Sequence, residues 1–370
     1  MANVFWCTNC LNMSTRPRVT FDTRGWCNAC QWAEEKKRLD WAKRQDELRE
    51  LLDKFRSKEG GFDCVVPVSG GKDGSYVACR LRDDYGMKPL CITVTPALSL
   101  ELGNTNLRNF INSGFNHIQI NPDSEAMRVL NRAGFVEKGF PYYGWLISIQ
   151  AAVVRMAVNL NIPLLFYGED GEVEYGGSTE SKNRAIYSIE YMRRIYLEGG
   201  YEKVLNASRL SEGQLSFFKF PSERELAGKD LSITHWSYFE SWDPYRNYLV
   251  AKEKCGLQEA SESNSGTFTN FAQNDQALYA LHTYMMYLKF GFGRATQDVG
   301  IEIRRGAMTR GQGVNLVRLY DGQYPEEFVP TYLEYYQMTR QEFDAVLDRW
   351  VNKDLFEKKE GRWAPLFTVE

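Results

Sequence analysis

Short apolar runs alternate with longer segments of helical periodicity over the stretch 62–167. The runs have the length of buried strands, and the segments between them repeat apolar residues every three or four positions, as amphipathic helices do. The predicted strands are 62–68, 89–94, 117–120 and 163–167, and the predicted helices are 75–85, 104–113, 124–132 and 145–159. This alternation predicts a doubly wound, mostly parallel α/β sheet, which binds ligands beyond the carboxyl ends of its strands.

The rest of the chain is mostly helical in pattern. Residues 31–58 are highly charged and carry apolar residues on one helical face, which predicts a single solvated helix. An aromatic-rich helical insertion follows the sheet pattern, and 231–239 predicts a further strand. A helix is predicted over 276–290, and capping boxes predict two more helix starts at Thr309 and Thr339.

A glycine-rich loop joins the first predicted strand to the first predicted helix. It reads Ser69-Gly70-Gly71-Lys72-Asp73-Gly74-Ser75. Glycines let backbone amides approach a ligand, Lys72 adds a positive charge, and the serines add hydroxyl donors. The N–H groups and dipole of the following helix also favour an anion. The loop predicts a phosphate cradle, with a plain glycine turn as the alternative. It is not a Walker A loop, because Asp73 follows Lys72 where that motif needs Ser or Thr.

Four of the eight cysteines lie in two Cys-x-x-Cys pairs near the start of the chain. The pairs are Cys7 with Cys10 and Cys27 with Cys30. This spacing is typical of a four-cysteine zinc ribbon, in which two tight knuckles present four thiolates to one ion. An iron site and a redox dithiol remain alternatives. The other four cysteines lie in apolar segments, and we expect them to be packing residues.

An acidic loop follows the fourth predicted strand. It places Glu169, Asp170, Glu172 and Glu174 among glycines. Carboxylates in such a loop can bind Mg²⁺ or act as a general base. Because the loop lies at the mouth of the predicted sheet, we expect Glu169 and Asp170 to be catalytic. A solvated acidic turn is the alternative.

Two cations beside a Gly-x-Gly stretch are candidate nucleotide contacts. Lys289 and Arg294 flank this stretch, where flexible backbone and positive charge occur together. The stretch lacks the third glycine and the preceding strand of a dinucleotide-binding fingerprint. A helix C-cap accounts for the same residues equally well, because glycine and basic residues gather there. Arg304, Arg305 and Arg310 are weaker candidates of the same kind.

Composition and charge narrow the classes of function. The chain has 370 residues, of which 43% are hydrophobic and 25% charged, so it has enough apolar material for a large core. A net charge of -3 argues against broad binding to nucleic acid. The sequence shows neither a signal-peptide pattern nor an apolar run of the ~18 residues that a membrane span needs. We therefore expect a cytoplasmic protein.

The glycine-rich loop resembles the PP-loop of ATP pyrophosphatases, whose pattern is Ser-Gly-Gly-x-Asp-Ser. The chain differs by Gly74, which separates Asp73 from Ser75. A narrower resemblance removes this difference, because the N-acetyl sugar amidotransferases of bacterial surface polysaccharide and nonulosonic acid synthesis carry the glycine too. The cysteine pairs and both loops support this resemblance. Three further motifs do so as well: Thr267-Phe268-Thr269-Asn270-Phe271, Lys289-Phe290-Gly291-Phe292-Gly293-Arg294-Ala295-Thr296 and Met308-Thr309-Arg310.

The resemblance implies an ATP-dependent reaction on a nucleotide-linked sugar. ATP would be cleaved between its α and β phosphates, the acetamido oxygen would be adenylated, and ammonia would displace AMP to leave an acetamidino group. The implied cofactors are ATP and Mg²⁺, beside Zn²⁺ in the ribbon. The loop Ser69 to Ser75, with Lys289 and Arg294, would bind the nucleotide, and Asp73 would help to place magnesium. Lys72, Asp73, Glu169 and Asp170 are the expected catalytic residues.

No glutaminase nucleophile is visible in the sequence. Removal of Met1 would expose Ala2, and the three histidines have no glycine-framed cysteine nearby. We therefore expect a separate glutaminase to deliver ammonia. The resemblance implies a pair of partners similar to the glutaminase and cyclase subunits of imidazole glycerol phosphate synthase. The ribbon and its helix are a candidate docking surface for them.

The predicted domains are a zinc ribbon at 1–35, a linker helix at 36–59, an ATP pyrophosphatase domain at 60–305 with a helical insertion near 180–230, and a helical C-terminal region at 306–370. Two other functions stay open. A tRNA-modifying PP-loop enzyme fits the loop, although the acidic balance and the lack of paired cysteines in the core do not favour it. A non-catalytic zinc-ribbon adaptor with a nucleotide fold would bind ATP without turnover.

Overall fold

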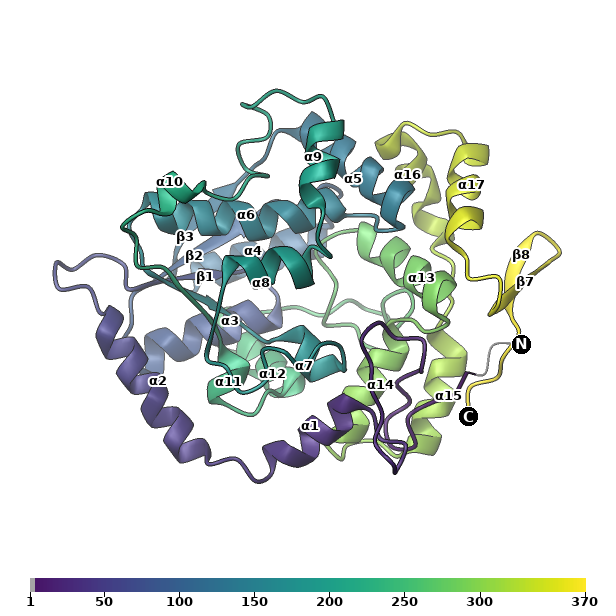
Figure 1. Cartoon of the computed structure of the whole chain (residues 1–370), viewed down its shortest axis with the longest axis horizontal. Helices are drawn as coiled ribbons and strands as arrows, with labels where there is room; N and C mark the ends of the chain where they lie inside the picture. The colour runs from purple at the N-terminus through teal and green to yellow at the C-terminus, as the bar shows by residue number, and fades with distance from the viewer. Residues whose placement is uncertain (1–3) are drawn as a thin grey trace.

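The N-terminal segment of the molecule has little regular structure. The computed structural model describes residues 4–370 (Figure 1), so Ala2 and the other first positions of the predicted ribbon lie outside the described residues. Isolated bridges join Trp6 to Met13 and Phe21 to Cys27. Pairings this short suit a segment whose fold depends on its cysteines rather than on a large apolar core.

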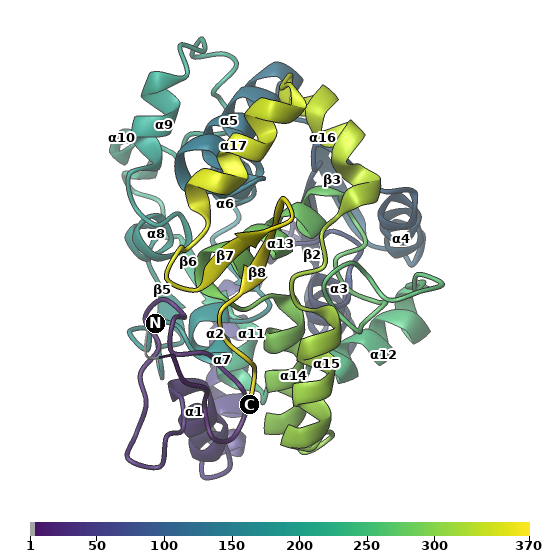
Figure 2. The same cartoon turned by 90° about the vertical axis from the view of Figure 1, so that its right-hand side faces the viewer.

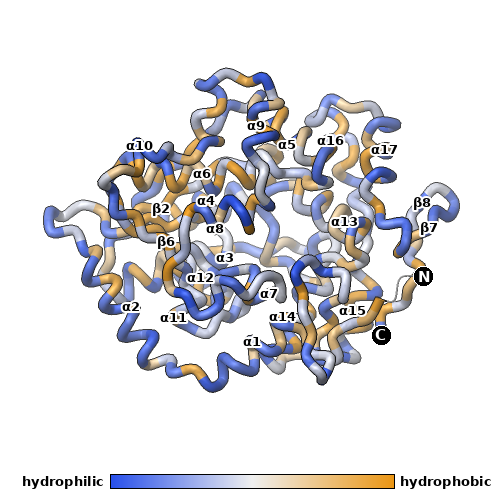
Figure 3. Tube along the Cα trace, in the orientation of Figure 1, coloured by the Kyte–Doolittle hydropathy of each residue, from blue (hydrophilic) through white to orange (hydrophobic). Residues whose placement is uncertain are grey.

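Two helices replace the single helix predicted over 31–58. They are α1 (Asn28–Lys36) and α2 (Trp41–Phe55). The break lies at Asp40, whose carboxylate accepts a 3.0 Å hydrogen bond from the amide of Lys43 and so begins a new helix. α2 keeps the amphipathic character expected of this segment, and Figure 3 shows hydrophilic and hydrophobic positions following one another along it.

A six-stranded sheet forms the centre of the described chain. Its strands, in spatial order, are β3 (Asn116–Ile120), β2 (Pro89–Val94), β1 (Cys64–Pro67), β4 (Leu164–Tyr167), β6 (Ser232–His235) and β5 (Ile186–Tyr187). The first five are parallel, and β5 is antiparallel to β6. The predicted doubly wound, mostly parallel sheet is confirmed. The strand predicted at 231–239 is shorter than expected, because helix α11 (Trp236–Phe239) directly follows β6.

Both faces of the sheet are buried. Along β1, Val65 belongs to one hydrophobic cluster, while Cys64 and Val66 belong to a second cluster on the opposite face. Helices α5 (Ser124–Lys138), α6 (Tyr143–Asn159) and α13 (Leu278–Phe290) contribute to the first cluster, and α3 (Lys72–Cys79), the π-helical turn η1 (Arg80–Asp84), α4 (Glu101–Asn112) and α12 (Pro244–Cys255) contribute to the second. Burial on both faces explains why the central strands β1, β2 and β4 are mostly apolar in the sequence, whereas the edge strand β3 is partly exposed and carries polar residues.

An insertion between β4 and β6 carries the antiparallel edge strand. Its elements are α7 (Gly171–Tyr175), β5, α8 (Ile189–Tyr191), the π-helical turn η2 (Met192–Tyr196), α9 (Tyr201–Ala207) and α10 (Glu223–Leu226). Tyr201, Phe218 and Phe220 are buried in the same cluster as α6. The high aromatic content of this stretch therefore serves packing.

The C-terminal region extends the core of the sheet. Its elements are α14 (Arg294–Arg304), α15 (Arg310–Tyr320), the 3₁₀ turn η3 (Glu326–Phe328), α16 (Val329–Tyr336), α17 (Arg340–Trp350), β7 (Phe356–Lys359) and β8 (Arg362–Pro365). Both predicted capping boxes are present, at Thr309 and Thr339. Tyr332 and Phe343 share a cluster with Val65 of β1. Figure 2 shows α14 and α15 side by side, next to the C-terminus. In the part of the chain that the structure describes, no helix is long and apolar enough to cross a membrane.

Candidate active site and metal centre

The glycine-rich loop lies between β1 and α3, where two glycines permit close approach of backbone. Gly70 has a φ of +80°, and a Cβ there would lie 2.4 Å from the backbone nitrogen of Leu107 in α4. A Cβ on Gly74 would lie 2.7 Å from the carbonyl oxygen of Pro67. Backbone atoms in a packed interior have little room to shift. The glycine that is extra to the PP-loop pattern is therefore required where the first turn of α3 meets β1.

Lys72 and Asp73 lie in the first turn of α3, directly after the N-cap Gly71. The ammonium of Lys72 forms an ion pair with Oδ2 of Asp73. Nδ2 of Asn247, a buried residue of α12, donates a 3.0 Å hydrogen bond to Oδ1 of Asp73. These two contacts hold the carboxylate at the end of the loop. No motif or spacing in the sequence linked Asn247 to this loop.

A polar cavity of about 290 Å³ opens beside the loop. The residues expected from the sequence that line it are Ser69, Gly71, Lys72, Asp73, Gly74, Glu169 and Arg294. Asn106, Tyr142, Tyr175, Asn274, Asp275 and Tyr279 also line it. The expected residues that are absent from its lining are Gly70, Ser75, Asp170 and Lys289. The loops after β1 and β4 both contribute, so the cavity lies where doubly wound sheets bind their ligands.

Glu169 lies in the polar cavity at the end of β4. The hydroxyl of Tyr175 donates a 3.0 Å hydrogen bond to Oε1 of Glu169. Burial raises the pKa of Glu169 to about 7, and the negative charge of Asp73 adds to the effect. A carboxyl group with this pKa gains and loses its proton near neutral pH, as a general base must.

Asp170 instead holds the acidic loop in shape. Its side chain is 1% exposed, and it caps α7 by accepting a 3.0 Å hydrogen bond from the amide of Glu172. The hydroxyls of Ser181 and Tyr196 also donate to its carboxylate. With these acceptor positions occupied, Asp170 is tied to the insertion, whereas its neighbour Glu169 lines the cavity.

The two remaining acids of the loop attach it to the N-terminal segment. Glu172 accepts two hydrogen bonds from Arg18, both 2.8 Å long. Glu174 accepts hydrogen bonds from Nζ of Lys36 at 2.7 Å and from Nε1 of Trp32 at 2.9 Å. Neither carboxylate lines the polar cavity. The acids that the sequence offered as magnesium ligands thus bring the ribbon next to the sheet.

Arg294 reaches the cavity from the start of α14. Its Nε donates to Asp298 at 2.8 Å, and Asp298 also accepts a 2.6 Å hydrogen bond from the hydroxyl of Thr267. This chain of contacts joins two of the motifs recognised in the sequence. Lys289 lies elsewhere, because its ammonium donates at 2.8 Å to the carbonyl oxygen of Lys138. Lys138 is the last residue of α5, so this contact is one that basic residues commonly make with the free carbonyl groups at the C-terminus of a helix.

Asp275 is a third acidic group of the cavity, beside Asp73 and Glu169. It lies in the polar loop before α13, and a Cβ on Gly103 of α4 would lie 2.4 Å from its Cα. Burial raises the pKa of Asp275 to about 6. The sequence showed a polar loop at this point. It contained no signal that Asp275 would face the glycine-rich loop, because the contact depends on the packing of α4.

An apolar cavity of about 240 Å³ adjoins the polar one. The two share Ser69, Gly74, Gly103 and Asp275 in their linings. The apolar cavity is otherwise lined mainly by side chains of β1, β2 and α6, including Val68, Ile92, Val94, Trp145, Ile149 and Val153. A ligand that spans both cavities would place an apolar, flat portion in one and a charged portion in the other.

The four cysteines of the two pairs form one buried cluster. Their sulfur atoms lie within 4.8 Å of one another, with Cys10 and Cys27 separated by 3.5 Å. The amide of Asn12 donates to Cys27 Sγ at 3.3 Å, and the backbone amide of Cys27 donates to Cys7 Sγ at 3.2 Å. Such N–H donors stabilise thiolates. Sulfur donors at these separations fit a tetrahedral zinc site, as the spacing predicted.

The titration of the thiols also favours a bound cation. A hydrogen bond from the thiol of Cys10 lowers the pKa of Cys7 and lowers that of Cys27 to about 7. Hydrogen bonds to neighbouring thiols raise the pKa values of Cys10, led by the contact with Cys27, and of Cys30, led by the contact with Cys10. Four negative charges in one buried site repel one another, so full ionisation needs a metal ion.

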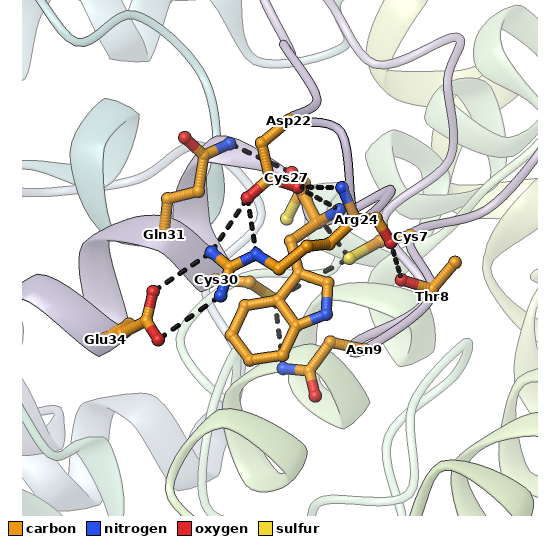
Figure 4. Close-up of polar contacts among 10 residues, drawn as sticks. Cys7, Thr8, Asn9, Asp22, Arg24, Cys27, Cys30, Gln31 and Glu34 are labelled. Atoms are coloured by element: carbon orange, nitrogen blue, oxygen red, sulfur yellow. Dashed lines mark hydrogen bonds and ion pairs between the residues drawn. The ribbon is translucent and has the colours of Figure 1, made fainter.

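Charged residues brace the cluster from outside. Figure 4 shows Arg24 between Asp22 and Glu34, with hydrogen bonds to Asp22 at 2.8 Å and to Glu34 at 3.0 Å. The guanidinium also lies over the ring of Trp26, 4.2 Å from its centroid. Arg24 therefore ties the segment before the second cysteine pair to α1.

Comparison with known families and structures finds a family match for the C-terminal part of the chain. Residues 265–368 match the family model described as "LPS biosynthesis protein WbpG-like, C-terminal domain". This stretch contributes Asp275 and Arg294 to the cavity, and the match agrees with the resemblance drawn from the three motifs that lie within it. A comparison with curated proteins found no match. A solved structure described as a predicted subunit of a tRNA methyltransferase from Methanocaldococcus jannaschii is 14% identical, covers 60% of this chain and 86% of that chain, and has a TM-score of 0.26.

Proposed function

We propose, from the WbpG-like character of the C-terminal region and the polar cavity beside the glycine-rich loop, that the chain is an ATP-dependent amidotransferase subunit acting on nucleotide-linked acetamido sugars. The acetamido oxygen attacks the α phosphorus of ATP, pyrophosphate leaves, and an O-adenylyl imidate forms. Ammonia then adds to the imidate carbon and AMP leaves, which yields an acetamidino group. An amide oxygen is a poor leaving group, so adenylation is what makes the substitution possible.

The adjoining cavities support ATP as the activating substrate. The apolar cavity, walled by β2 and α6, offers a surface for the adenine ring, and the shared residues Ser69 and Gly74 lie where the phosphates would enter the polar cavity. The amides at the start of α3 and the charge of Lys72 suit pyrophosphate as the leaving group. Asp73 is the residue we assign to magnesium, which would neutralise phosphate charge when bound.

Glu169 is the residue we assign to proton transfer. Attack by ammonia creates a positively charged nitrogen, which must lose a proton before AMP leaves cleanly. A carboxylate at the rim of the loop, with a pKa of about 7, can take that proton at neutral pH. Asp170 is a positioning residue, since its contacts with Ser181 and Tyr196 fix the backbone that carries Glu169.

A partner protein supplies the ammonia in this proposal. All eight cysteines of the described residues are buried, and four of them form the cysteine cluster. Cys79 faces Cys255, with 3.4 Å between the two sulfur atoms. Among residues 4–370 we therefore find no exposed thiol that fits a glutaminase nucleophile. Glutaminase and cyclase-like subunits would complete the enzyme, and their substrate pathway would be lipopolysaccharide biosynthesis.

The observation that carries the proposal is the convergence of Lys72, Asp73, Glu169 and Arg294 on one cavity. The test is to incubate the chain with ATP, Mg²⁺, ammonium at alkaline pH and a panel of nucleotide-linked acetamido sugars, and to identify the products. We expect AMP and pyrophosphate. Lys72→Ala should lower the rate by ~10² to 10³ through loss of ~2 to 4 kcal/mol of transition-state stabilisation.

Lys254→Ala is the matched control, because Lys254 pairs with Asp83 away from the cavity. It should keep the rate of the unaltered chain. Formation of ADP and phosphate would refute the assignment of the loop. Hydrolysis of glutamine by the purified chain alone would refute the requirement for a partner.

A further inference from the structure

A third cavity, which we call the ribbon cavity, lies on the other side of Tyr175 from the polar cavity. Its volume is about 390 Å³. Its walls come from α1, the start of α2, the segment 241–244 and the C-terminal end of α14. Tyr175 lines both this cavity and the polar one. The proposed reaction assigns no role to this space.

Only one layer of side chains separates the two cavities. Trp242 lines the ribbon cavity, and its Cη2 would lie 3.0 Å from a Cβ placed on Gly168. The same Cβ would lie 3.5 Å from Cβ of Asp73. On the polar side, the hydroxyl of Tyr175 contacts Glu169. A molecule bound in the ribbon cavity therefore has the proposed reacting groups directly behind Tyr175 and Trp242.

The ribbon cavity is positively charged, although the whole chain carries a net charge of -3. Four basic residues, Lys36, Lys37, Arg304 and Arg305, line it against two acids, Glu174 and Asp243. Glu174 is engaged by Lys36, and Asp243 caps α12 by accepting hydrogen bonds from two backbone amides. Arg305 forms an ion pair with Glu302 at 2.6 Å, and one of its terminal nitrogens lies 3.9 Å from Asp243. Lys37 is exposed and has no ion-pair partner among the described residues. The excess charge favours an anion such as a diphosphate.

The aromatic lining suits the other parts of a nucleotide sugar. Trp41, Tyr175 and Trp242 present ring surfaces to the cavity, and flat aromatic rings stack on nucleobases and on sugar faces. Nε1 of Trp242 is buried and has no acceptor among the described residues. A buried donor without a partner favours a ligand that can accept its hydrogen bond.

We propose that the ribbon cavity binds the nucleoside diphosphate portion of the sugar substrate, so that the acetamido group reaches the polar cavity past Tyr175. This inference rests on the proposed function. It gives the cysteine cluster a second role, because α1, which begins directly after Cys27 and contains Cys30, forms one wall of the substrate site. Lys37 and Arg305 contact the diphosphate, and the aromatic rings contact the base or the sugar.

The test is a binding titration of the whole chain with UDP, GDP and dTDP, each in the presence of saturating α,β-methylene-ATP, which occupies the loop without being cleaved. We expect at least one of the three to bind. Lys37→Glu should weaken that binding by ~10-fold or more, since it replaces a charge-assisted contact by a repulsion. Arg305→Ala should weaken it by ~10-fold. Arg38→Glu is the control, because Arg38 is exposed beside Lys37 but does not line the cavity.

The outcomes separate the two proposals. The proposal that the ribbon cavity binds the nucleotide is refuted if none of the three nucleotides binds. It is also refuted if Arg38→Glu weakens binding as much as Lys37→Glu does. Loss of binding in Lys72→Ala but not in Lys37→Glu would refute it as well. A nucleoside diphosphate that binds in a Lys37-dependent way, in a chain that does not bind α,β-methylene-ATP, would support the ribbon cavity and refute the proposed function. Unchanged binding of α,β-methylene-ATP by the Lys37 and Arg305 variants would show that they remain folded.

Discussion

The cysteine cluster and the polar cavity are assembled in opposite ways. Two short knuckles separated by a single excursion of the chain hold all four thiols, so their spacing alone identifies the site. The polar cavity joins the loop after β1, the loop after β4 and the start of α14, so its lining runs from Ser69 to Arg294 in the chain. A site held by local turns can be recognised from the sequence. A site held by packing can be recognised only in part.

The largest expected effect concerns the cysteine cluster. Cys27→Ser removes one thiolate and should release the metal, because structural zinc sites commonly contribute ~10 to 16 kcal/mol of apparent binding energy to a small domain. We expect loss of zinc by elemental analysis and increased proteolysis before residue 36. The sheet should remain folded, since its two clusters contain none of the four ligands.

Cys91→Ala is the matched control, because Cys91 is a buried thiol of β2 outside the cluster. It should keep one zinc per chain. Unchanged zinc content in the Cys27 variant would show that the cluster does not bind the metal through four thiolates.

The next largest effect concerns the polar cavity. Asp73→Ala removes the carboxylate held by Lys72 and Asn247, and should lower the rate of AMP formation by ~10² to 10³ with little change in stability. Asp83→Ala is the control, since Asp83 pairs with Arg82 and Lys254 outside the cavity. Equal loss of rate in both variants would contradict a specific role for Asp73.

Replacing Glu169 by Gln should change activity and stability in opposite directions. Its folded pKa of about 7 lies above the ordinary value of 4.5, so its favourable contribution to stability is complete below pH 4.5 and is lost as the pH rises through about 7. Glu169→Gln should therefore stabilise the fold at pH 8, by at most about 3 kcal/mol, because one unit of pKa corresponds to about 1.4 kcal/mol.

The same variant should lose the ascending limb of the pH–rate profile. In the unaltered chain, the rate measured at a constant concentration of free ammonia should rise with pH to a plateau above about pH 7, as the carboxylate that accepts the proton becomes available. Thermal unfolding at pH 5 and pH 8, together with rates over the same range, provides the measurement. An ascending limb that survives in Glu169→Gln would assign the proton transfer to another group, with Asp275 the next candidate.

The sequence predicted those features whose cause is local. The strands at 89–94 and 163–167, both capping boxes and the cysteine cluster depend on neighbours in the chain, and the structure contains all of them. The break in the helix at 31–58 was missed, although Asp40 is a recognisable N-cap residue, because the charged pattern continues on both sides of it. The turn of helix after His235 was missed because Trp236–Phe239 continues the apolar run of β6.

The candidate site was less accessible to sequence reasoning, because adjacent residues have opposite surroundings. Glu169 and Asp170 are adjacent acidic residues of one loop, yet only Glu169 lines the cavity. The carboxylate of Asp170 instead accepts hydrogen bonds from the hydroxyls of Ser181 and Tyr196. Asn247 and Asp275 reach the site through the packing of α12 and α4. No spacing in the chain encodes such contacts, which depend on how helices lie across the sheet.

The smallest expected effect concerns Lys289, which the sequence placed beside Arg294 as an equal candidate for nucleotide binding. The structure gives the two residues different partners: Arg294 lines the cavity and pairs with Asp298, while Lys289 donates to the carbonyl oxygen of Lys138. Lys289→Ala should change the rate of AMP formation by less than about threefold, yet lower the free energy of unfolding by about 1 to 3 kcal/mol, the range for a lost hydrogen bond from a charged donor.

Arg294→Ala provides the comparison, because it should lower the rate by ~10-fold or more if its charge contacts phosphate. Lys289→Met keeps an unbranched aliphatic side chain but loses the ammonium that lies 5.1 Å from the ring centroid of Trp350, so it should recover only part of the stability without altering the rate. A rate loss in Lys289→Ala that matches that of Arg294→Ala would place both cations in the nucleotide site. Because the two residues lie on either side of one Gly-x-Gly, their different behaviour would show that the packing of α14 against α7 and α15, rather than proximity in sequence, decides which cation reaches the ligand.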